Sequence, residues 1–583
     1  MRPTGDTGGM ASLGTPMSTP LSPEARADAL RRMGTEELDV LVIGGGVVGV
    51  GAALDAVTRG LKVGLVEARD WAAGTSSRSS KLFHGGLRYL EQLNFALVFE
   101  ALKERKLALE TLCPHLAHPV EFLYPLQKTG IDRAYAGLGI AVYDVMGAGR
   151  GVPTHLRHHG RRKTYEDFPS AKPGALTGSI TFYEGQVDDA RHTMMIARTA
   201  AHYGALVASS ARVTGFARTA GRITGATVTD LENGTNIEVR AKHVINATGV
   251  WVDEIQELIG GRGQFRVRAS KGIHLVVPRE RISSRTGIIT RTEKSLLFVI
   301  PWGNFWFIGT TDTDWALDLA HPAASAADID YVLEHVNALL LDPLTREDVI
   351  GVYAGLRPLL AGEDESTSKL SREHAVSSPA PGLTAVAGGK YTTYRIMALD
   401  AVDAAVKDLD AGTGPSITED VPLVGADGYH ALWNSRRLLA ERTGLDQSWV
   451  EHLLNRYGSL LPELLALIEA DPTLAEPLAG AKEYLRVEAV YAASHEGALH
   501  LDDVLARRTR ASIETWDRGT VAAEEVARLV APVLGWDDAD VAREVEHYVA
   551  RVAAERESQT QPDDQTADAA RVGAPDVRVG APS

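Results

Sequence analysis

The stretch DVLVIGGGVVGVGAALDAVTRGLKVGLVEARD, residues 39–70, constrains the fold more than any other part of the sequence. Its hydrophobic pattern predicts a buried parallel strand at 39–43, a helix at 47–59 and a second strand at 62–66. The turn before the helix forms the motif G-x-G-x-x-G and contains Gly44, Gly45, Gly46 and Gly49. This order of elements is typical of a domain that binds a dinucleotide.

Each part of the motif has a physical role in holding a pyrophosphate. Gly44 allows the tight turn, Gly46 lets the pyrophosphate approach the backbone, and Gly49 lets the helix pack closely on the strand. The start of the helix offers unpaired N–H groups and the positive end of the helix dipole. Glu67 ends the second strand, where its carboxylate accepts from the ribose hydroxyls of an adenosine. The motif predicts a dinucleotide site, but it does not choose between NAD and FAD.

Two segments far along the chain favour FAD. HVINATGVW (243–251) is predicted to be a strand that ends at Thr248-Gly249, where the backbone can approach a ligand again. AVAGGKYTTYR (385–395) is predicted to be a strand, a glycine loop and a helix start, with backbone donors at Gly388, Gly389 and Thr392. A cofactor held from both ends of the chain suits a long, buried FAD better than an exchangeable NAD.

Composition and charge exclude several other classes of protein. The 583 residues are 44% hydrophobic and 23% charged, which is an ordinary globular balance for two to four domains. The net charge of −16 argues against nucleic-acid binding, which needs a basic surface. The single cysteine, Cys113, excludes an intrachain disulfide and a cysteine-based zinc or iron–sulfur site, and we interpret it as a packed core residue. No signal peptide or membrane-spanning run is apparent, which favours a cytoplasmic protein with at most peripheral membrane contact.

The character of the sequence changes once along the chain. Up to about residue 410, β-branched runs alternate with glycine-rich turns and helical stretches, and after about residue 425 helical spacing takes over. The pattern predicts an α/β part with some longer antiparallel strands and a helical C-terminal domain (425–555). The two ends are predicted to be a disordered N-terminal extension (1–37) and a disordered tail (556–583), which repeats RVGAP at 571–575 and 578–582.

Two apolar stripes support the helical C-terminal domain. The first follows a candidate N-cap at Asp446 and contains Val450, Leu453, Leu454 and Tyr457. The second lies in the last predicted helix and contains Val541, Val545, Tyr548 and Val549. We interpret both stripes as core rather than as binding surface.

The polar stretch SSRSSKLFHGGLRYLEQ, residues 76–92, is too polar for a core strand and too rich in glycine for an ordinary helix. Thr75 and the residues Ser76, Ser80 and Lys81 follow the second strand closely, so they are predicted to reach the pyrophosphate and flavin. His84 is expected to support the flavin rather than to act as an acid or base. Arg78 faces either the flavin phosphate or solvent. After Gly85-Gly86 helical spacing resumes, which places Arg88 and Tyr89 near the flavin ring, unless Arg88 pairs with Glu91 on a solvated face.

Several long motifs, in order from about residue 38 to 550, resemble the FAD-dependent glycerol-3-phosphate dehydrogenases. They include SSRSSKLFHGGLRYLE, VDDARHT (187–193), VINATGVW, KGIHLVVP (271–278), VIPWGNFWFIGTTDTDW (299–315), YAGLRPLL (353–360) and GGKYTTYR (388–395). The resemblance implies an α/β FAD-binding domain of the glutathione-reductase or D-amino-acid-oxidase type, discontinuous over 38–110, 175–255 and 350–410. It implies an interleaved α+β substrate domain (111–174 and 256–349) and an all-α C-terminal domain. It also implies oxidation of sn-glycerol 3-phosphate to dihydroxyacetone phosphate, with electrons passed to a membrane quinone at the inner face of the cell membrane, and a possible homodimer.

The resemblance also implies which residues bind and oxidise the substrate. The substrate-binding residues would be Arg88, Tyr89, Arg357, Arg372 and Lys390, with His274 as a further pocket residue. A phosphate monoester needs cationic donors, and arginine supplies a bidentate pair of hydrogen bonds that lysine cannot. The catalytic candidates are His274 as base, because its ordinary pKa is nearest neutrality, and Lys390 or Arg357 as stabilisers of the developing alkoxide. From its position on a strand alone, His274 is more often a structural histidine than a base.

Three alternatives remain at this stage. The enzyme could be a glycerol-phosphate oxidase that uses dioxygen, or the chain could be a non-catalytic flavin-binding redox module. The basic run HLRHHGRRK (155–163) could contact anionic lipid headgroups or form a solvated loop, and it lacks the carboxylates and the spacing of a metal site. No metal is predicted.

Overall fold

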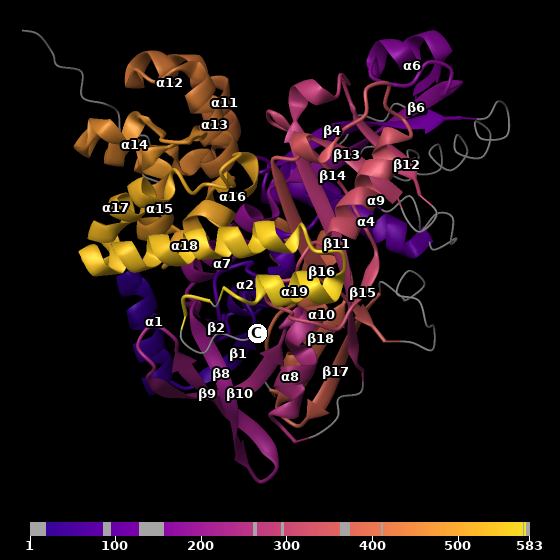
Figure 1. The fold of residues 1–583 in the computed structure, drawn as a ribbon. Helices are drawn as coiled ribbons and strands as arrows, with labels where there is room; N and C mark the ends of the chain where they lie inside the picture. Colours follow the sequence, from indigo (N-terminus) through magenta and orange to yellow (C-terminus); the bar gives the residue numbers. More distant parts are fainter. Residues whose placement is uncertain are drawn as a thin grey trace, which may run out of the picture.

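The computed structural model describes residues 19–85, 95–127, 157–260, 265–292, 296–361, 373–409, 412–574 and 576–578. Two β-sheets and a helical C-terminal domain make up this part of the chain (Figure 1). Within it, no helix combines the length and the apolar character that crossing a membrane requires.

The first sheet contains the predicted dinucleotide fold. In spatial order its main strands are β17 (His374–Ala380), β18 (Leu383–Gly388), β10 (Asn236–Asn246), β1 (Leu38–Ile43), β2 (Val63–Val66) and β7 (Leu206–Ala208). All of these run parallel except β17, which is antiparallel to β18. The strands β8 (Ala211–Thr219) and β9 (Arg222–Asp230) extend β10 as an antiparallel ribbon.

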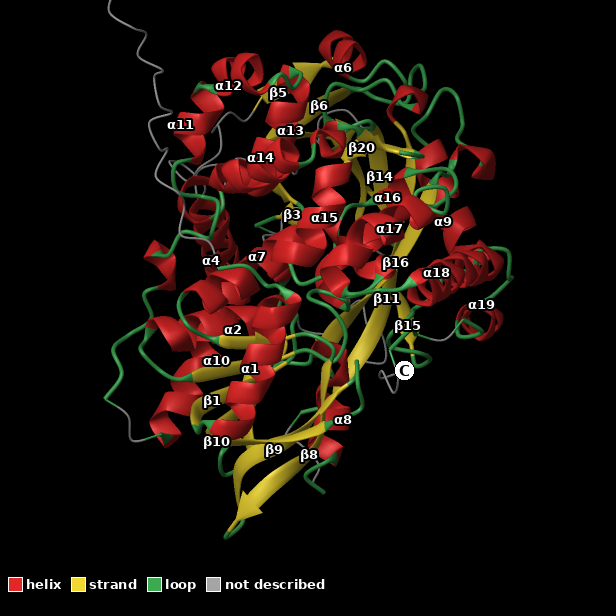
Figure 2. Ribbon diagram, turned by 90° about the vertical axis from the view of Figure 1, so that its left-hand side faces the viewer, coloured by secondary structure: helices red, strands yellow, loops and turns green. Residues whose placement is uncertain are grey.

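Helices cover both faces of this sheet, as its apolar strands require (Figure 2). One face carries α2 (Val47–Thr58), packed between α7 (Asp189–His202) and α10 (Tyr394–Asp408). The other face carries α1 (Pro23–Thr35). Alternate residues of β1 divide between the two cores, because Val42 packs in the cluster that holds α2 and Leu41 in the cluster that holds α1.

The second sheet is largely antiparallel and forms the substrate domain. In spatial order it contains β15 (Thr313–Trp315), β11 (Val267–Pro278), β14 (Phe305–Gly309), β13 (Leu296–Trp302), β12 (Gly287–Arg291), β4 (Ala117–Leu126), β6 (Gly178–Val187) and β3 (Leu82–Phe83). The strand β16 (Gly351–Leu360) also pairs with β11, and β5 (Arg157–Gly160) with β6. The helix α9 (Ala326–Asn337) packs against this sheet.

The sheet assignments correct the predicted domain boundaries. Residues 175–255 and 350–410 were expected to lie wholly in the FAD-binding domain, but β6 and β16 belong to the second sheet. The reason is that the chain crosses between the two sheets at these strands, and a crossing leaves no mark in local hydrophobic periodicity. The short strand β3 crosses in the same way, directly after the turn η1 (Thr75–Ser77).

The C-terminal domain is helical, with one small hairpin that the sequence pattern did not predict. Its helices are α11 (Tyr429–Asn434), α12 (Arg436–Thr443), α13 (Gln447–Tyr457), α14 (Leu461–Ala470), α15 (Arg486–His495), α16 (Ala511–Glu514), α17 (Ala523–Leu534) and α18 (Asp538–Ser558), and its hairpin is β19 (Pro477–Leu478) with β20 (Ala481–Leu485). The stripe of α13 is fully buried, as predicted. In α18, Val541 and Tyr548 are buried, but Val549 is 43% exposed, because the buried face of α18 instead carries Glu544 and Arg551.

Two predicted disordered segments are ordered where the structure describes them. In the extension 1–37, Ser22 caps α1, and Leu30 and Met33 of α1 are buried. In the tail 556–583, α19 (Asp564–Arg571) packs beside α18 at the front of the molecule (Figure 1). The charges of the tail suggested a solvated segment, but they meet buried partners of opposite sign. Asp564 pairs with Lys271, Asp576 with Arg69 at 2.9 Å, and Arg578 with Asp503 at 2.8 Å.

Buried ion pairs join the helical domain to the first sheet and its loops. Asp70, after β2, accepts from Arg508 at 2.7 Å and from Arg507 at 2.5 Å. Arg191 of α7 donates to Glu496 at 2.6 Å. These charges are nearly inaccessible to solvent, so each depends on its partner to offset the cost of desolvation.

His500 is part of one such contact and makes it sensitive to pH. Its two ring nitrogens each lie 3.0 Å from a carboxylate, Glu544 of α18 and Glu232 at the end of β9. Burial and the Arg578 charge lower the pKa of His500, but the hydrogen bonds to Glu232 and Glu544 outweigh them and raise the pKa to about 9. The folded state therefore holds a proton on His500 that the unfolded chain releases near pH 6.5.

We expect this contact to stabilise the fold fully below pH 6.5 and to be lost as the pH rises through about 9. The contribution to the free energy of unfolding is about 3 kcal/mol at its maximum. Chemical denaturation of the wild type and of His500→Gln across pH 6–10 measures it. The stability difference between the two proteins should shrink toward high pH, and parallel curves would contradict the assignment.

Candidate active site

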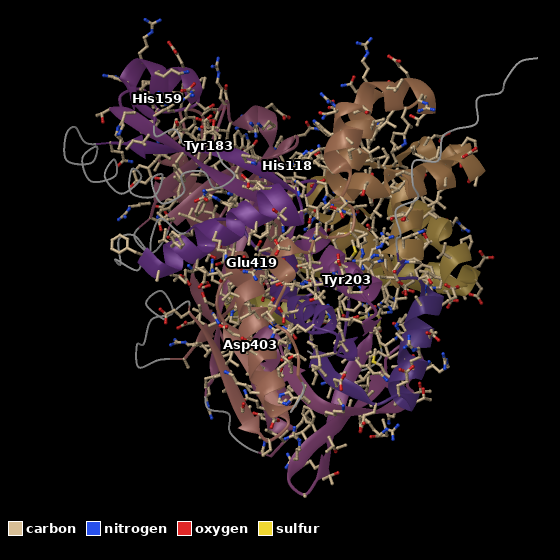
Figure 3. The ribbon with its side chains drawn as sticks, turned by 180° about the vertical axis from the view of Figure 1, so that it is seen from behind. His118, His159, Tyr183, Tyr203, Asp403 and Glu419 are labelled. Atoms are coloured by element: carbon tan, nitrogen blue, oxygen red, sulfur yellow. The ribbon has the colours of Figure 1, made fainter. Side chains whose placement is uncertain are left out.

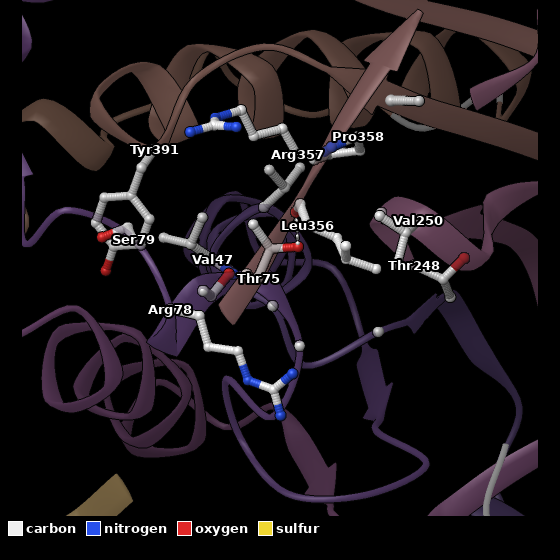
Figure 4. Close-up of a pocket in the computed structure, with 18 of the residues that line it drawn as sticks. Val47, Thr75, Arg78, Ser79, Thr248, Val250, Leu356, Arg357, Pro358 and Tyr391 are labelled. Atoms are coloured by element: carbon white, nitrogen blue, oxygen red, sulfur yellow. Dashed lines mark hydrogen bonds between the residues drawn. The ribbon is translucent and has the colours of Figure 1, made fainter. Parts of the chain in front are cut away.

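A cavity of about 810 Å³ lies where the dinucleotide turn of the first sheet meets β11 and β16 of the second (Figure 4). Its volume is within the range of cofactor pockets. The structure brings most of the predicted cofactor residues to its wall. These are Gly44, Gly46, Glu67, Thr75, Ser76, Ser80, His84, Thr248, Gly249, Gly388, Gly389 and Thr392. Three of the residues predicted to bind substrate or to act in catalysis, His274, Arg357 and Lys390, also line this cavity.

The glycines of the turn have the roles that their spacing predicts. Gly44 has a φ of +112°, and a Cβ there would lie 2.7 Å from the Ala247 carbonyl oxygen. A Cβ on Gly49 would lie 1.9 Å from the Gly44 carbonyl oxygen, so only glycine permits this packing of α2. Gly45 lines no part of the cavity. It gives room to Glu67, whose Cβ would lie 2.7 Å from an added Cβ.

The polar groups around the start of α2 are already oriented. The Glu67 carboxylate accepts from the Gly45 N–H at 2.6 Å and from the Arg69 N–H at 2.8 Å. Burial raises the pKa of Glu67, and the two backbone donors oppose that rise. Ser76 Oγ accepts from the Val47 N–H at 2.9 Å, so this side chain shares the donors at the helix start that we assigned to a pyrophosphate.

The opposite wall comes from distant parts of the chain. Gly249, Gly388 and Gly389 have positive φ angles of +62°, +79° and +75°, which bend the backbone along the cavity. The 3₁₀ turn η7 (Tyr391–Thr393) follows and leads into α10. Thr392 Oγ1 accepts from the His84 N–H at 3.2 Å, which joins η7 to the strand β3.

The loop between η1 and β3 is held by the buried carboxylate of Asp189, at the start of α7. Asp189 accepts from the backbone and hydroxyl of Ser79, at 2.9 and 2.7 Å, and pairs with Arg510 at 2.7 Å. It also pairs with Lys81 at 2.6 Å. Lys81, which was predicted to bind the cofactor, is not among the residues that line the cavity. Its ammonium lies outside the cavity, fully buried against Asp189, because a buried lysine needs a counter-charge.

His274 lies on β11, opposite Gly309 of β14 and Tyr353 of β16. Its ring stacks on Tyr353 with 4.8 Å between centroids, and Nε2 lies 2.9 Å from Ser80 Oγ. A Cβ on Gly309 would lie 2.6 Å from the His274 ring, so that glycine leaves space for it. Burial, with the nearby charges of Lys81 and Arg357, holds the pKa of His274 well below its usual value. The imidazole is therefore neutral at pH 7 and able to accept a proton.

Arg357 lies on β16 and reaches across β11 at Gly272. Its Nη2 donates to Thr310 Oγ1 and to the Thr311 carbonyl, both at 3.1 Å, and its Nη1 lies 3.7 Å from the Asp312 carboxylate. A Cβ on Gly272 would lie 2.5 Å from Arg357 Nη2. Gly272 therefore makes the path along which the guanidinium reaches the cavity.

Lys390 and Arg78 add to the cationic lining of this cavity, which also includes Arg69 and Arg212. Lys390 directly follows Gly389 and precedes η7. Arg78 is half-buried at the cavity wall, and its Nη1 donates to the Ala320 carbonyl at 3.2 Å. Three predicted substrate residues, Arg88, Tyr89 and Arg372, lie outside the described residues.

Sequence reasoning missed several residues that shape this site. Asp189 stands in VDDARHT, Tyr353 in YAGLRPLL, and Asp312 in the run TTDTD, all within motifs quoted above but without a role. Their functions depend on contacts between residues that are tens to hundreds of positions apart, such as Arg510 with Asp189. The available signal was the position of these residues inside motifs that also contain assigned residues.

The site fits FAD on its own geometry. The turn has the space that a pyrophosphate needs, Glu67 lies at the end of β2 for a ribose, and the cavity continues to His274 and Arg357. Among the described residues, no cluster of His, Cys, Asp and Glu has the geometry to hold a metal ion.

Comparisons with known proteins agree with this geometry. The family model "FAD dependent oxidoreductase" matches residues 39–395, and the model "C-terminal domain of alpha-glycerophosphate oxidase" matches residues 416–541. Glycerol-3-phosphate dehydrogenase 2 of Mycobacterium tuberculosis is 60% identical over 558 residues, which cover 96% of this chain and 95% of the relative. The mitochondrial glycerol-3-phosphate dehydrogenase of Homo sapiens is 35% identical and covers 88% of this chain, with 73% of its own length matched.

A solved structure extends the likeness to three dimensions. The glycerol-3-phosphate dehydrogenase from Bacillus halodurans, complexed with FAD, superimposes with a TM-score of 0.76 at 29% identity. The match covers 91% of this chain and 98% of that one. The predicted fold class and the choice of FAD over NAD are confirmed. With its family model, its relatives and its fold in agreement, the chain belongs to the FAD-dependent glycerol-3-phosphate dehydrogenases.

Proposed function

We propose that this enzyme oxidises sn-glycerol 3-phosphate to dihydroxyacetone phosphate with Arg357 and Lys390 on the phosphate side of the cavity and His274 as base, and that its electrons pass to a membrane quinone. The observation that carries the proposal is that one cavity contains the dinucleotide turn, a neutral histidine and the cationic side chains of Arg357 and Lys390. Its relatives named above carry the same activity in their names.

The chain's own residues divide the work of the oxidation. When bound, FAD accepts the hydride that leaves C2 of the substrate. Arg357 presents a planar guanidinium, already oriented by Thr310 and Thr311, which suits a phosphate monoester. Lys390 supplies a second positive charge at the wall of the same cavity, where it stabilises negative charge that develops on the substrate oxygen.

His274 takes the hydroxyl proton at Nε2. This nitrogen faces Ser80, which lines the cavity, whereas Nδ1 is buried and has no hydrogen-bond partner among the described residues. Tyr353 fixes the plane of the ring by stacking on it, and Ser80 fixes its rotation. Loss of the proton from the hydroxyl and of the hydride from C2 together leave a carbonyl, which is the ketone of dihydroxyacetone phosphate.

The proposal of a membrane quinone as acceptor places the enzyme at the inner face of the cell membrane. The basic run at 155–163 does not strengthen this placement. In the structure its described part forms β5 and the short helix α6 (Arg161–Asp167) rather than a loop, and His159 lies at the outer rim of the molecule (Figure 3). Arg162 and Lys163 pair with Glu166 and Asp167 on the same helix, which favours a solvated face over a lipid headgroup site.

Flavin absorbance under anaerobic conditions tests the reaction and its acceptor in sequence. We expect glycerol 3-phosphate to bleach the oxidised flavin, and unphosphorylated glycerol to leave it unchanged at the same concentration. Reoxidation of the reduced enzyme should then be faster with a soluble quinone than with air-saturated buffer in a stopped-flow instrument. Flavin that stays oxidised would indicate a non-catalytic redox module, and preferred reoxidation by dioxygen would indicate an oxidase.

Arg357→Ala tests the contact with phosphate. We expect kcat/KM for glycerol 3-phosphate to fall by an amount equivalent to about 2–5 kcal/mol, because the phosphate loses a charge-assisted pair inside a buried site. Arg357→Lys should recover only part of this loss, because a lysine keeps the positive charge but lacks the two parallel N–H donors of the guanidinium. Arg268→Ala is the matched control, because Arg268 also lies on the second sheet but pairs with Asp314 at the surface. An equal loss in both alanine variants would refute the assignment.

The pH dependence of kcat/KM tests His274. The deprotonated ring is the active form, so activity is lost as the pH falls through the pKa of His274 in the folded enzyme. Since burial and two cations lower that pKa, the acidic limb should lie well below pH 6.5. His274→Asn should abolish this limb and reduce kcat by about 10²–10⁴-fold. An acidic limb at or above pH 6.5 that survives in His274→Asn would assign the base to another group.

A further inference from the structure

A second, smaller cavity of about 110 Å³ lies between the loop after η1, the strand β16 and the helices α18 and α19. We call it the tail cavity, because α19 of the C-terminal tail forms one of its walls. Five arginines line it: Arg78, Arg507, Arg510, Arg551 and Arg571. Two carboxylates, those of Asp502 and Glu555, line it as well. The wall thus carries more positive than negative charge.

Three of these arginines have counter-charges of their own. Arg507 pairs with Asp70 and Asp503, and Arg510 pairs with Asp188 and Asp189. Arg551 lies 3.3 Å from Asp502. Of the two carboxylates, Asp502 is also shared with Arg507, and Glu555 pairs with Arg518 at 3.2 Å. The carboxylates of the wall are therefore already engaged by these cations.

Among the described residues, Arg571 and Arg78 form no ion pair of their own. Arg571, the last residue of α19, is 5% exposed, and its Nη1 is buried with no hydrogen-bond partner in the described part of the chain. Arg78 donates to a neutral acceptor, the Ala320 carbonyl. Burial and the Arg551 charge lower the pKa of Arg571 to about 10, although the nearby carboxylates of Glu555 and Asp502 oppose this shift. Burial and neighbouring arginines lower the pKa of Arg78 to about 9. An unpaired guanidinium is costly to bury, so an anion in this cavity would remove a real penalty.

The repeat RVGAP in the tail supplies an internal comparison. Its two arginines, Arg571 and Arg578, are both buried, at 5% and 4% exposure. Arg578 donates to both carboxylate oxygens of Asp503, at 2.9 and 2.8 Å. Arg571 instead lines the tail cavity. The same residue type in the same short repeat therefore pairs with a protein carboxylate in one copy and lines a cavity in the other.

We propose that the tail cavity binds a tetrahedral oxyanion, a phosphate group or sulfate, held by Arg571 from α19, Arg78 from the loop after η1 and Arg551 from α18. Guanidinium groups from different elements suit the several oxygens of such an anion, which accept charge-assisted hydrogen bonds. The anion replaces the missing counter-charge and fastens the tail to the flavin domain. Arg78 lines both the tail cavity and the cofactor cavity. An anion bound to Arg78 therefore also contacts a residue of the active-site wall.

The test uses the full-length holoenzyme at constant ionic strength, with sodium chloride replaced stepwise by sodium phosphate, sodium sulfate or methyl phosphate. We expect a saturable rise in the melting temperature with phosphate or sulfate, and at least a tenfold weaker apparent affinity in Arg571→Gln. The apparent affinity of Arg571→Lys for these anions should lie between those of the wild type and of Arg571→Gln. A response to methyl phosphate equal to that of inorganic phosphate would identify the end of a phosphate ester as an acceptable occupant, whereas a weaker one would restrict the site to the free anion.

Arg578→Gln is the matched control. It should lower the melting temperature in chloride, because it leaves Asp503 with less compensation, yet keep the phosphate response. The active site also attracts phosphate, but that binding persists in Arg571→Gln, so only the difference between the proteins reports on the tail cavity. The proposal would be overturned if the melting temperature of the wild type did not rise when phosphate or sulfate replaced chloride. It would also be overturned if Arg571→Gln showed an equal rise with the same apparent affinity.

Hydrogen exchange on the wild type alone provides a second measurement that needs no variant. We expect phosphate to slow the exchange of backbone amides in α19 and in the loop after η1. Slower exchange confined to the active-site segments around β11 and β16, with α19 unchanged, would also overturn the proposal.

Discussion

The active site depends most on the contacts that the buried carboxylate of Asp189 makes. It binds the loop after η1 through Ser79, neutralises Lys81 and meets Arg510 from the helical domain. Two cations and the donors of the loop together offset the cost of burying it. Because this loop also carries Ser80, which orients His274, the geometry of the proposed base follows from an ion pair between domains.

The cofactor cradle was predictable from the sequence because its interactions are local. Gly44, Gly49 and Glu67 lie within one strand–helix–strand unit, and their spacing alone specifies the turn, the packing of α2 and the carboxylate at the end of β2. The helix α13 was predictable for the same reason. Spacing alone did not assign His274 or Arg357. Resemblance to a family placed them in a pocket, and the structure brings both to one cavity.

Features that depend on distant contacts could not be read from local patterns. The strands β6 and β16 have the apolar character of either sheet, and only their hydrogen-bond partners assign them to the second. The tail beyond residue 556 has a polar composition typical of disorder, yet Asp564 and Arg578 find buried charges from other parts of the chain. The composition of a segment gives the number of its charges, but it does not show whether the rest of the fold presents charges of opposite sign to them.

The pairing of Asp70 with Arg507 and Arg508 has a consequence for recombination among related enzymes. Consider a chimera that joins the two sheets of one parent to the helical C-terminal domain of another. It must carry oppositely charged residues at the positions of Asp70 and of Arg507 and Arg508. If only one side changes, a buried charge loses its counter-charge. The hybrid protein is then less stable, even when each of its parts folds well in its own parent. In this chain, exchange of either segment therefore requires electrostatic compatibility between residues more than four hundred positions apart.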